Sequence, residues 1–128
     1  MEQAKRAGVA NVHYVLAVPD VAATAAWWTE KMGFALWMEP QGWKFVRRDG
    51  CSIMLGQCPD AIAPAKLGDH QYFAYVEMDD VDAYHAEIVA NGVETISGPA
   101  DKPWGMREMA VSTPDGHRVM FAQDLPRR

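Results

Sequence analysis

Side chains that could bind a metal or a small molecule recur on segments of this sequence that alternate with period two. Residues two apart on a strand share a face, so such segments present a defined set of side chains to one side. Phe73, Tyr75 and Glu77 alternate in this way and put two rings and a carboxylate on one face. Rings beside a carboxylate suit a flat ligand that is cationic or donates hydrogen bonds.

Tryptophan supplies further candidates, with five in 128 residues. Trp37, Trp43 and Trp104 lie on or beside segments with strand patterns, where their rings could stack on a ligand or simply fill the core. Arg107 and Glu108 are neighbours on another such segment, so only one of the two can face a cavity.

Several function classes find no support in the sequence. No Ser/His/Asp order, glycine-rich phosphate loop or basic aromatic stripe stands out. Cys51 and Cys58 form no Cys-x-x-Cys pair, which indicates reduced thiols rather than a zinc site. The net charge of −5 argues against nucleic acid and anionic membranes as partners. No apolar run approaches about 18 residues and no signal peptide is recognisable, so we expect a cytoplasmic protein.

A repeat indicates how these residues are arranged. Residues 49–57 (DGCSIMLGQ) and 115–123 (DGHRVMFAQ), 66 positions apart, share Asp, Gly, Met and Gln at identical spacing. A chain that repeats itself in this way is expected to contain two copies of one unit.

Each predicted unit is strand, helix and three strands. In the first unit we predict a helix over residues 21–32 and strands over 12–18, 35–38, 43–48 and 51–57. In the second we predict a helix over residues 81–90, a loop over 99–103, and strands over 71–78, 94–97, 106–112 and 118–123. The predicted organisation is a disordered tail (1–10), a first βαβββ module (11–58), a linker (59–70) and a second βαβββ module (71–125), all in one compact domain. This is an α+β fold in which curved, mainly antiparallel sheets surround a cup-shaped cavity, with one helix packed outside each module.

The chain resembles the vicinal oxygen chelate superfamily in the order of its elements and in the sequence segment PWGMREMAVSTPDGHRVMF. This superfamily includes glyoxalase I, extradiol dioxygenases, and fosfomycin and bleomycin resistance proteins. The resemblance covers residues 11–125. It is carried by His13, Pro19-Asp20-Val21, Met32-Gly33-Phe34, Asp79-Asp80-Val81-Asp82 and Pro114-Asp115-Gly116.

In enzymes of that family four cavity-facing positions bind a divalent metal, and the resemblance places His13, Met54, Phe73 and Met120 there. Divalent metals prefer imidazole and carboxylate ligands, whereas a thioether is a poor ligand and a phenyl ring is none. The resemblance therefore implies no metal and no cofactor. His70, Glu77, Glu108 and His117 lie near the same strand ends and are the alternative ligands.

The local sequence is most similar to that of the bleomycin resistance branch. The resemblance thus implies a metal-free protein that sequesters a flat or cationic, antibiotic-like ligand in an apolar, aromatic-lined crevice. The residues expected to contact that ligand are His13, Trp37, Trp43, Met54, Phe73, Tyr75, Glu77, Trp104, Arg107 and Met120. A homodimer is expected, because family members of this size usually pair and bleomycin-binding proteins share their crevices between subunits.

Two alternatives remain open at this point. One is an enzyme: a metal-dependent lyase, isomerase or oxygenase of the same superfamily, or a protein that uses Glu77, Glu108 or His13 as acid or base. The other is an interaction module whose cup is filled by its own side chains.

Overall fold

The computed structural model describes residues 9–68 and 71–126. The predicted tail falls outside this range except for its last two residues, as do the last two residues of the predicted linker, among them His70. None of the helices in the described part of the chain has the length and apolar character needed to cross a membrane.

Two βαβββ modules make up the fold, and the predicted α+β class is confirmed. The first module contains β1 (Tyr14–Val18), α1 (Val21–Glu30), β2 (Ala35–Met38), β3 (Trp43–Arg48) and β4 (Cys51–Gln57). The second contains β5 (Tyr72–Glu77), α2 (Val81–Ala90), β6 (Thr95–Asp101), β7 (Met106–Ser112) and β8 (Arg118–Asp124). The two sheets have equivalent strand orders, β1-β4-β3-β2 and β5-β8-β7-β6, and in each the first pair is parallel and the other two are antiparallel.

The glutamines of the sequence repeat begin the two helices. Gln57 and Gln123 accept hydrogen bonds from the first helical N–H groups, those of Val21 (2.8 Å) and Val81 (2.9 Å). The N-cap aspartates just before the two helices, Asp20 and Asp80, each accept a hydrogen bond from the backbone N–H three residues later, as expected for this position. Each last strand therefore fixes the start of its own module's helix, which explains why the repeat contains this residue twice.

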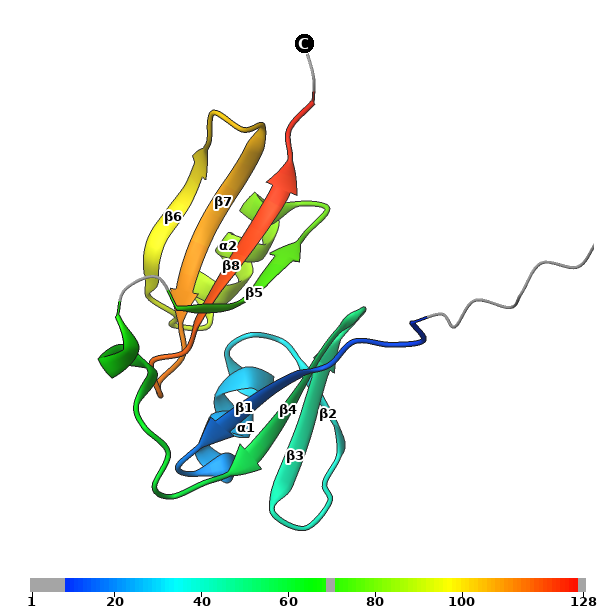
Figure 1. Ribbon diagram of the computed structural model, residues 1–128. Helices are drawn as coiled ribbons and strands as arrows, with labels where there is room; N and C mark the ends of the chain where they lie inside the picture. The colour runs from blue at the N-terminus through cyan, green and yellow to red at the C-terminus, as the bar shows by residue number, and fades with distance from the viewer. Residues whose placement is uncertain (1–8, 69–70, 127–128) are drawn as a thin grey trace, which may run out of the picture.

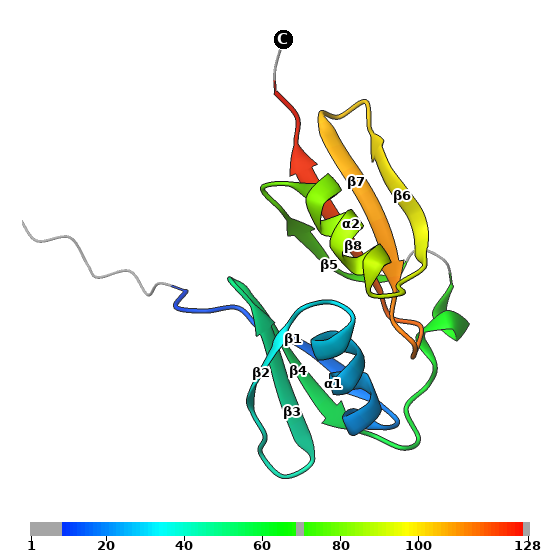
Figure 2. The same ribbon diagram turned by 180° about the vertical axis from the view of Figure 1, so that it is seen from behind.

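Both helices lie on the same side of the two sheets, which leaves the other face of each sheet open (Figures 1 and 2). Alternate strand residues point toward the helices and form one hydrophobic core that runs through both modules. Trp28 of α1 is completely buried in this core. The side chains between these core positions point to the open faces, where a ligand could reach them.

Two segments differ from the sequence prediction. β6 continues to Asp101 through the predicted loop, because Pro99 lies on an edge strand at a register shift between Ser97 and Ala100, where its missing N–H is tolerated. The predicted linker contains the 3₁₀ helix η1 (Pro64–Leu67), which has a proline in its first turn.

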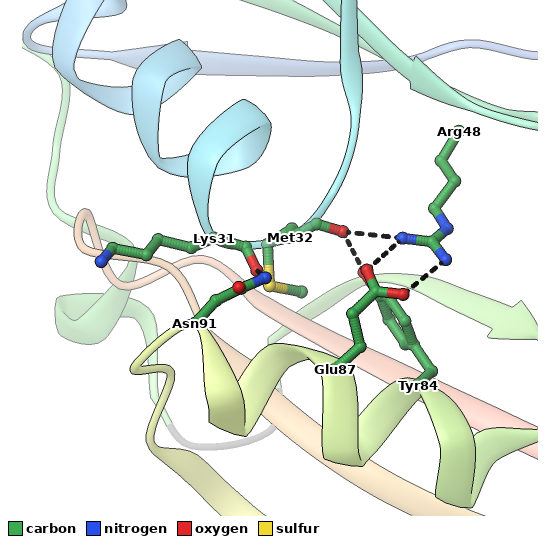
Figure 3. Close-up of polar contacts among 6 residues, drawn as sticks. All are labelled: Lys31, Met32, Arg48, Tyr84, Glu87 and Asn91. Carbon is green, nitrogen blue, oxygen red and sulfur yellow. Dashed lines mark hydrogen bonds and ion pairs between the residues drawn. The ribbon is translucent and has the colours of Figure 1, made fainter.

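The C-terminal end of α1 is completed by the second module (Figure 3). The last carbonyls of a helix have no partner within the helix. Here the carbonyl of Met32 accepts a hydrogen bond from the Tyr84 hydroxyl (2.8 Å) and that of Lys31 accepts one from the Asn91 amide (3.0 Å). Arg48 forms two hydrogen bonds with Glu87 at 2.6 and 3.0 Å, which lower the pKa of that carboxyl. We call these contacts the inter-module clamp.

A glycine is required beside the clamp. Gly33 has φ of +73° and follows α1. A Cβ at this position would collide with the guanidinium of Arg48 and lie 2.6 Å from a carboxylate oxygen of Glu87. Gly33 thus ends α1 in a left-handed conformation and leaves room for the Arg48–Glu87 pair.

Candidate functional site

The open face of the second sheet brings together aromatic and acidic side chains around Met120. Tyr75, Met120 and Ala110 are register partners on β5, β8 and β7, and form one row across the sheet. Glu77, Ala122 and Glu108 form the next row. The strands that carry the two glutamates are separated by one strand and so lie about 10 Å apart. The small Ala122 side chain between them is completely buried.

Glu108 is the centre of this face. Only 6% of the residue is exposed, and its Oε2 accepts hydrogen bonds from the Tyr75 hydroxyl and from Nε1 of Trp104, both at 2.7 Å. Burial of the Tyr75 hydroxyl is the main cause that raises its pKa, and the hydrogen bond to Glu108 raises this pKa further. The rings themselves remain accessible, since Tyr75 is 45% and Trp104 is 65% exposed. One carboxylate therefore orients two rings whose faces are free to contact a ligand.

Arg107 points to the opposite face from Glu108. It pairs with Asp82 of α2 at 3.0 Å and with Asp101 of β6 at 2.9 Å, and these bonds raise its pKa. Glu77 is exposed and does not pair with Arg107. Alternation along β7 therefore selects Glu108, rather than its neighbour, for the open face.

A shallow cavity of about 440 Å³ lies beside Met120. Its lining residues are Tyr14, Tyr72, Phe73, Ala74, Tyr75 and Met120. A register shift between Tyr72 and Ala74 turns Phe73 toward Tyr14 and Trp28, with ring centroids 5.9 and 6.3 Å away. The bulge thus gives Phe73 two roles, as part of the cavity wall and as a contact between the modules.

The open face of the first sheet has a methionine at the equivalent point. Met54 lies between its register partners Val15 and Phe45. In the next row the indole of Trp43 covers Gly56, where an added Cβ would lie 2.9 Å from the ring. This part of the face is apolar and aromatic.

The other end of the first face is basic. His13 precedes β1, and its Nδ1 is 2.8 Å from the Ser52 hydroxyl. The ring of His13 stacks beside Trp37 at 6.4 Å, and the guanidinium of Arg47 lies over the Trp37 indole at 5.0 Å. A cavity of about 280 Å³ is lined in part by these four residues.

This fold and its sequence match a known family. The family model described as Glyoxalase/Bleomycin resistance protein/Dioxygenase superfamily covers residues 11–121. The chain belongs to this superfamily. No curated protein sequence gives a significant match.

Solved structures of the superfamily show the same architecture. TioX from Micromonospora sp. ML1 is 25% identical, and the alignment covers 91% of this chain and 100% of TioX with a TM-score of 0.73. A bleomycin resistance determinant encoded on the transposon Tn5 is 23% identical, with 91% and 98% covered and a TM-score of 0.74. A glyoxalase/bleomycin resistance protein/dioxygenase from Alicyclobacillus acidocaldarius is only 10% identical, with 91% and 92% covered, yet has a TM-score of 0.76.

The four residues that the resemblance assigns to metal positions do not fit a divalent cation. Two are thioethers, and the ring of Phe73 packs against Trp28. The remaining one, His13, shares a hydrogen bond with Ser52. Across residues 9–68 and 71–126, no three His, Cys, Asp or Glu side chains are close enough to hold a metal ion. The alternative ligands Glu77, Glu108 and His117 are thus not grouped, and His70 lies outside the described residues.

The structure sorts the candidate residues by module. Tyr75, Glu77, Trp104 and Met120 share the second open face, whereas His13, Trp37, Trp43 and Met54 share the first. Arg107 lies on neither, and Phe73 lies between the modules. Two charged residues gain importance: Glu108, which alternation left undecided against Arg107, and Arg47, which pairs across the sheet with Ser52. Strand alternation with the correct register would have found Arg47, but the register was not available from the sequence.

Proposed function

We propose that this protein binds a small molecule without a metal and sequesters a flat, cationic ligand on its open faces, as a drug-binding member of the superfamily. The name of one structural relative, a bleomycin resistance determinant, supports this direction. The identity of the ligand is not part of the proposal.

The observation that carries the proposal is the group formed by Glu108, Tyr75 and Trp104. A carboxylate that is nearly withdrawn from water attracts a cation more strongly than one in bulk solvent. Exposed aromatic faces beside it add stacking and cation–π attraction. Met120 supplies an adaptable, polarizable surface at the position where superfamily enzymes have a metal ligand.

Titration of the purified full-length chain tests the proposal. Bleomycin, the planar cation acriflavine and a planar sulfonate anion are added separately while tryptophan fluorescence and calorimetric heat are recorded. We expect saturable binding of at least one cation at micromolar concentration and no comparable binding of the anion at this site.

Glu108→Gln is the informative variant, because the amide oxygen can still accept both hydrogen bonds while the charge is lost. We expect it to weaken cation binding at least about tenfold. Glu30→Gln makes the same charge change at the exposed end of α1 and is the control. Equal effects of the two substitutions, or no binding of any cation to the wild-type chain, would contradict the proposal.

We further propose that the chain forms a homodimer through exposed apolar residues of its edge strands β1 and β5. β1 and β5 each end their sheet and carry exposed apolar residues, among them Val15 (60%) and Tyr72 (38%). An exposed strand edge with such side chains favours pairing with another chain. Light scattering coupled to size-exclusion chromatography should give twice the chain mass for the wild type and the single chain mass for Val15→Asp. A monomeric wild type would exclude this arrangement.

Metal analysis separates this proposal from the enzymatic alternative. Protein purified without chelator should contain no stoichiometric transition metal. A stoichiometric metal that is lost together with activity on chelation would favour the superfamily's enzymatic chemistry.

A further inference from the structure

At the basic end of the first open face, the indole N–H of Trp37 lacks a hydrogen-bond acceptor. Nε1 of Trp37 is buried and has no hydrogen-bond partner among the described residues. Buried donors are nearly always paired, and leaving one unpaired costs about 1–3 kcal/mol. The indole of Trp37 lines the same cavity as the His13 ring, whose Nδ1 is already bonded to Ser52.

Arg47, an exposed side chain, adds a positive charge beside this donor. Within the described ranges no carboxylate lies within 4.0 Å of its guanidinium, in contrast to Arg48 and Arg107, which both have acidic partners. Its guanidinium lies 5.0 Å from the centre of the Trp37 ring, which holds it in place. The acidic residue nearest in sequence, Asp49, is exposed and also lines the cavity, but it forms no ion pair with Arg47.

The shape of the cavity limits what it could accept. Its volume of about 280 Å³ is at the small end for ligand pockets, which suits an oxyanion or an anion on a single ring. The arginine fork matches the geometry of a carboxylate or a phosphate group.

We propose that His13, Trp37, Arg47 and Ser52 form a binding subsite for an oxyanion, either a carboxylate or a phosphate. Arg47 binds the charge and the imidazole of His13 donates to its oxygens, while Nε1 of Trp37, which is buried in this structure, donates once its indole turns into the cavity. The subsite lies on the opposite module from Glu108 and has the opposite charge. It therefore does not depend on cation binding at Glu108, and either proposal can fail alone.

Calorimetric titration of the full-length chain with sodium benzoate, inorganic phosphate and neutral benzamide tests the subsite. We expect saturable binding of at least one of the two anions and none of benzamide. Tighter binding of benzoate identifies the natural group as a ring-borne carboxylate, whereas tighter binding of phosphate identifies a bare oxyanion. Absence of binding of either anion at millimolar concentration would overturn the proposal.

Three variants localise the binding. Arg47→Gln should weaken anion binding at least about tenfold, because a charge-assisted hydrogen bond is lost. Trp37→Phe keeps the ring beneath the guanidinium but removes the donor, and should weaken binding about fivefold. Lys66→Gln removes the same charge from η1, outside this cavity, and should bind the anion like the wild type. An equal loss in Arg47→Gln and Lys66→Gln would show nonspecific charge attraction and reject the subsite.

Discussion

The two open faces occupy equivalent positions in a repeated structure, yet they differ in charge and shape. Each has a methionine at its centre, Met54 or Met120. In the row beside the methionine, the first module has Ala17, Gly56 and Trp43 where the second has Glu77, Ala122 and Glu108. The indole of Trp43 covers the glycine of the first row, whereas the second row is acidic, with Glu108 buried and Glu77 exposed. The faces toward the helices, by contrast, are apolar in both modules.

This difference shows which parts of the repeat are constrained by folding and which by what the surface binds. The glutamines that begin the helices and the apolar core positions must be kept, because each module needs them to form. The open-face positions contribute less to the core and can diverge. The divergence gives one protein two surfaces of opposite character, one with Arg47 and the other with Glu108.

The two open faces can act as separate surfaces of one protein only if the modules keep a fixed arrangement. Among the substitutions considered, Gly33→Ala should disturb this arrangement most strongly. The substitution puts a Cβ on a left-handed backbone and displaces the ends of the Arg48 and Glu87 side chains, so we expect a loss of roughly 2–3 kcal/mol in the free energy of unfolding. Denaturant unfolding measures it. Gly42→Ala, with φ of +81° and open space around it, carries only the backbone penalty of about 1–2 kcal/mol. Equal losses in the two variants would mean that the clamp does not hold the modules tightly.

The Gly56→Ala substitution tests whether the Trp43 indole determines the shape of the row beside Met54. Gly56→Ala gives the first module the residue that the second has at Ala122, but the new Cβ would meet the Trp43 ring at 2.9 Å. We expect a destabilisation of about 1–2 kcal/mol from overpacking. In a Trp43→Ala background the same substitution should be nearly neutral, so a double-mutant cycle should give a coupling of at least about 1 kcal/mol. Additive effects would show that the indole does not occupy the row.

A crossed binding experiment tests the charges of the two faces. Glu108→Gln should weaken cation binding about tenfold, or about 1.4 kcal/mol, and leave benzoate binding unchanged. Arg47→Gln should do the reverse. If each variant weakened both ligands equally, the faces would form a single site rather than two of opposite charge.

The smallest effect concerns the residue that follows each Asp-Gly turn, Cys51 or His117. Burial raises the pKa of Cys51 from 9.0 to about 11 and lowers the pKa of His117 below 6.5, so both side chains are kept neutral. As pH falls below 6.5, His117 becomes protonated in the unfolded chain before it does in the folded chain. As pH rises above 9.0, Cys51 ionises in the unfolded chain before it does in the folded chain. Stability should therefore decline in both directions.

Two variants separate these contributions in thermal unfolding measured across pH. His117→Gln should flatten only the acid decline, and Cys51→Ala only the alkaline one. Unchanged slopes would indicate that neither side chain is shielded from water in solution.

The sequence predicted the architecture well, because the pattern that defines it is local. The repeated DG-x-x-x-M-x-x-Q segments and the capping aspartates lie within single strands or turns, so alternation and spacing reveal them. Pro99 was misread as part of a loop, since a proline on an edge strand cannot be distinguished from a loop proline without knowledge of the strand order.

The candidate site was less accessible from the sequence, because its grouping depends on register and on bulges. The bulge at Phe73 and the choice between Arg107 and Glu108 are set by neighbouring strands that are distant in the chain. The bonds from Tyr75 and Trp104 to Glu108 join β5, β7 and the turn before it, and no spacing rule connects them. Residue types alone indicated an aromatic and acidic surface, but not which carboxylate lies at its centre.

The inter-module clamp also has a consequence for how this chain folds. The end of α1 depends in part on the second module. The Lys31 carbonyl accepts a hydrogen bond from Asn91, and the Met32 carbonyl accepts one from Tyr84 as well as one from Arg48 of the first module. A fragment cut within the linker would lose the donors of Asn91 and Tyr84 and would expose the side of Trp28 that packs against Phe73. We therefore expect the two halves of the repeat to unfold as one cooperative unit.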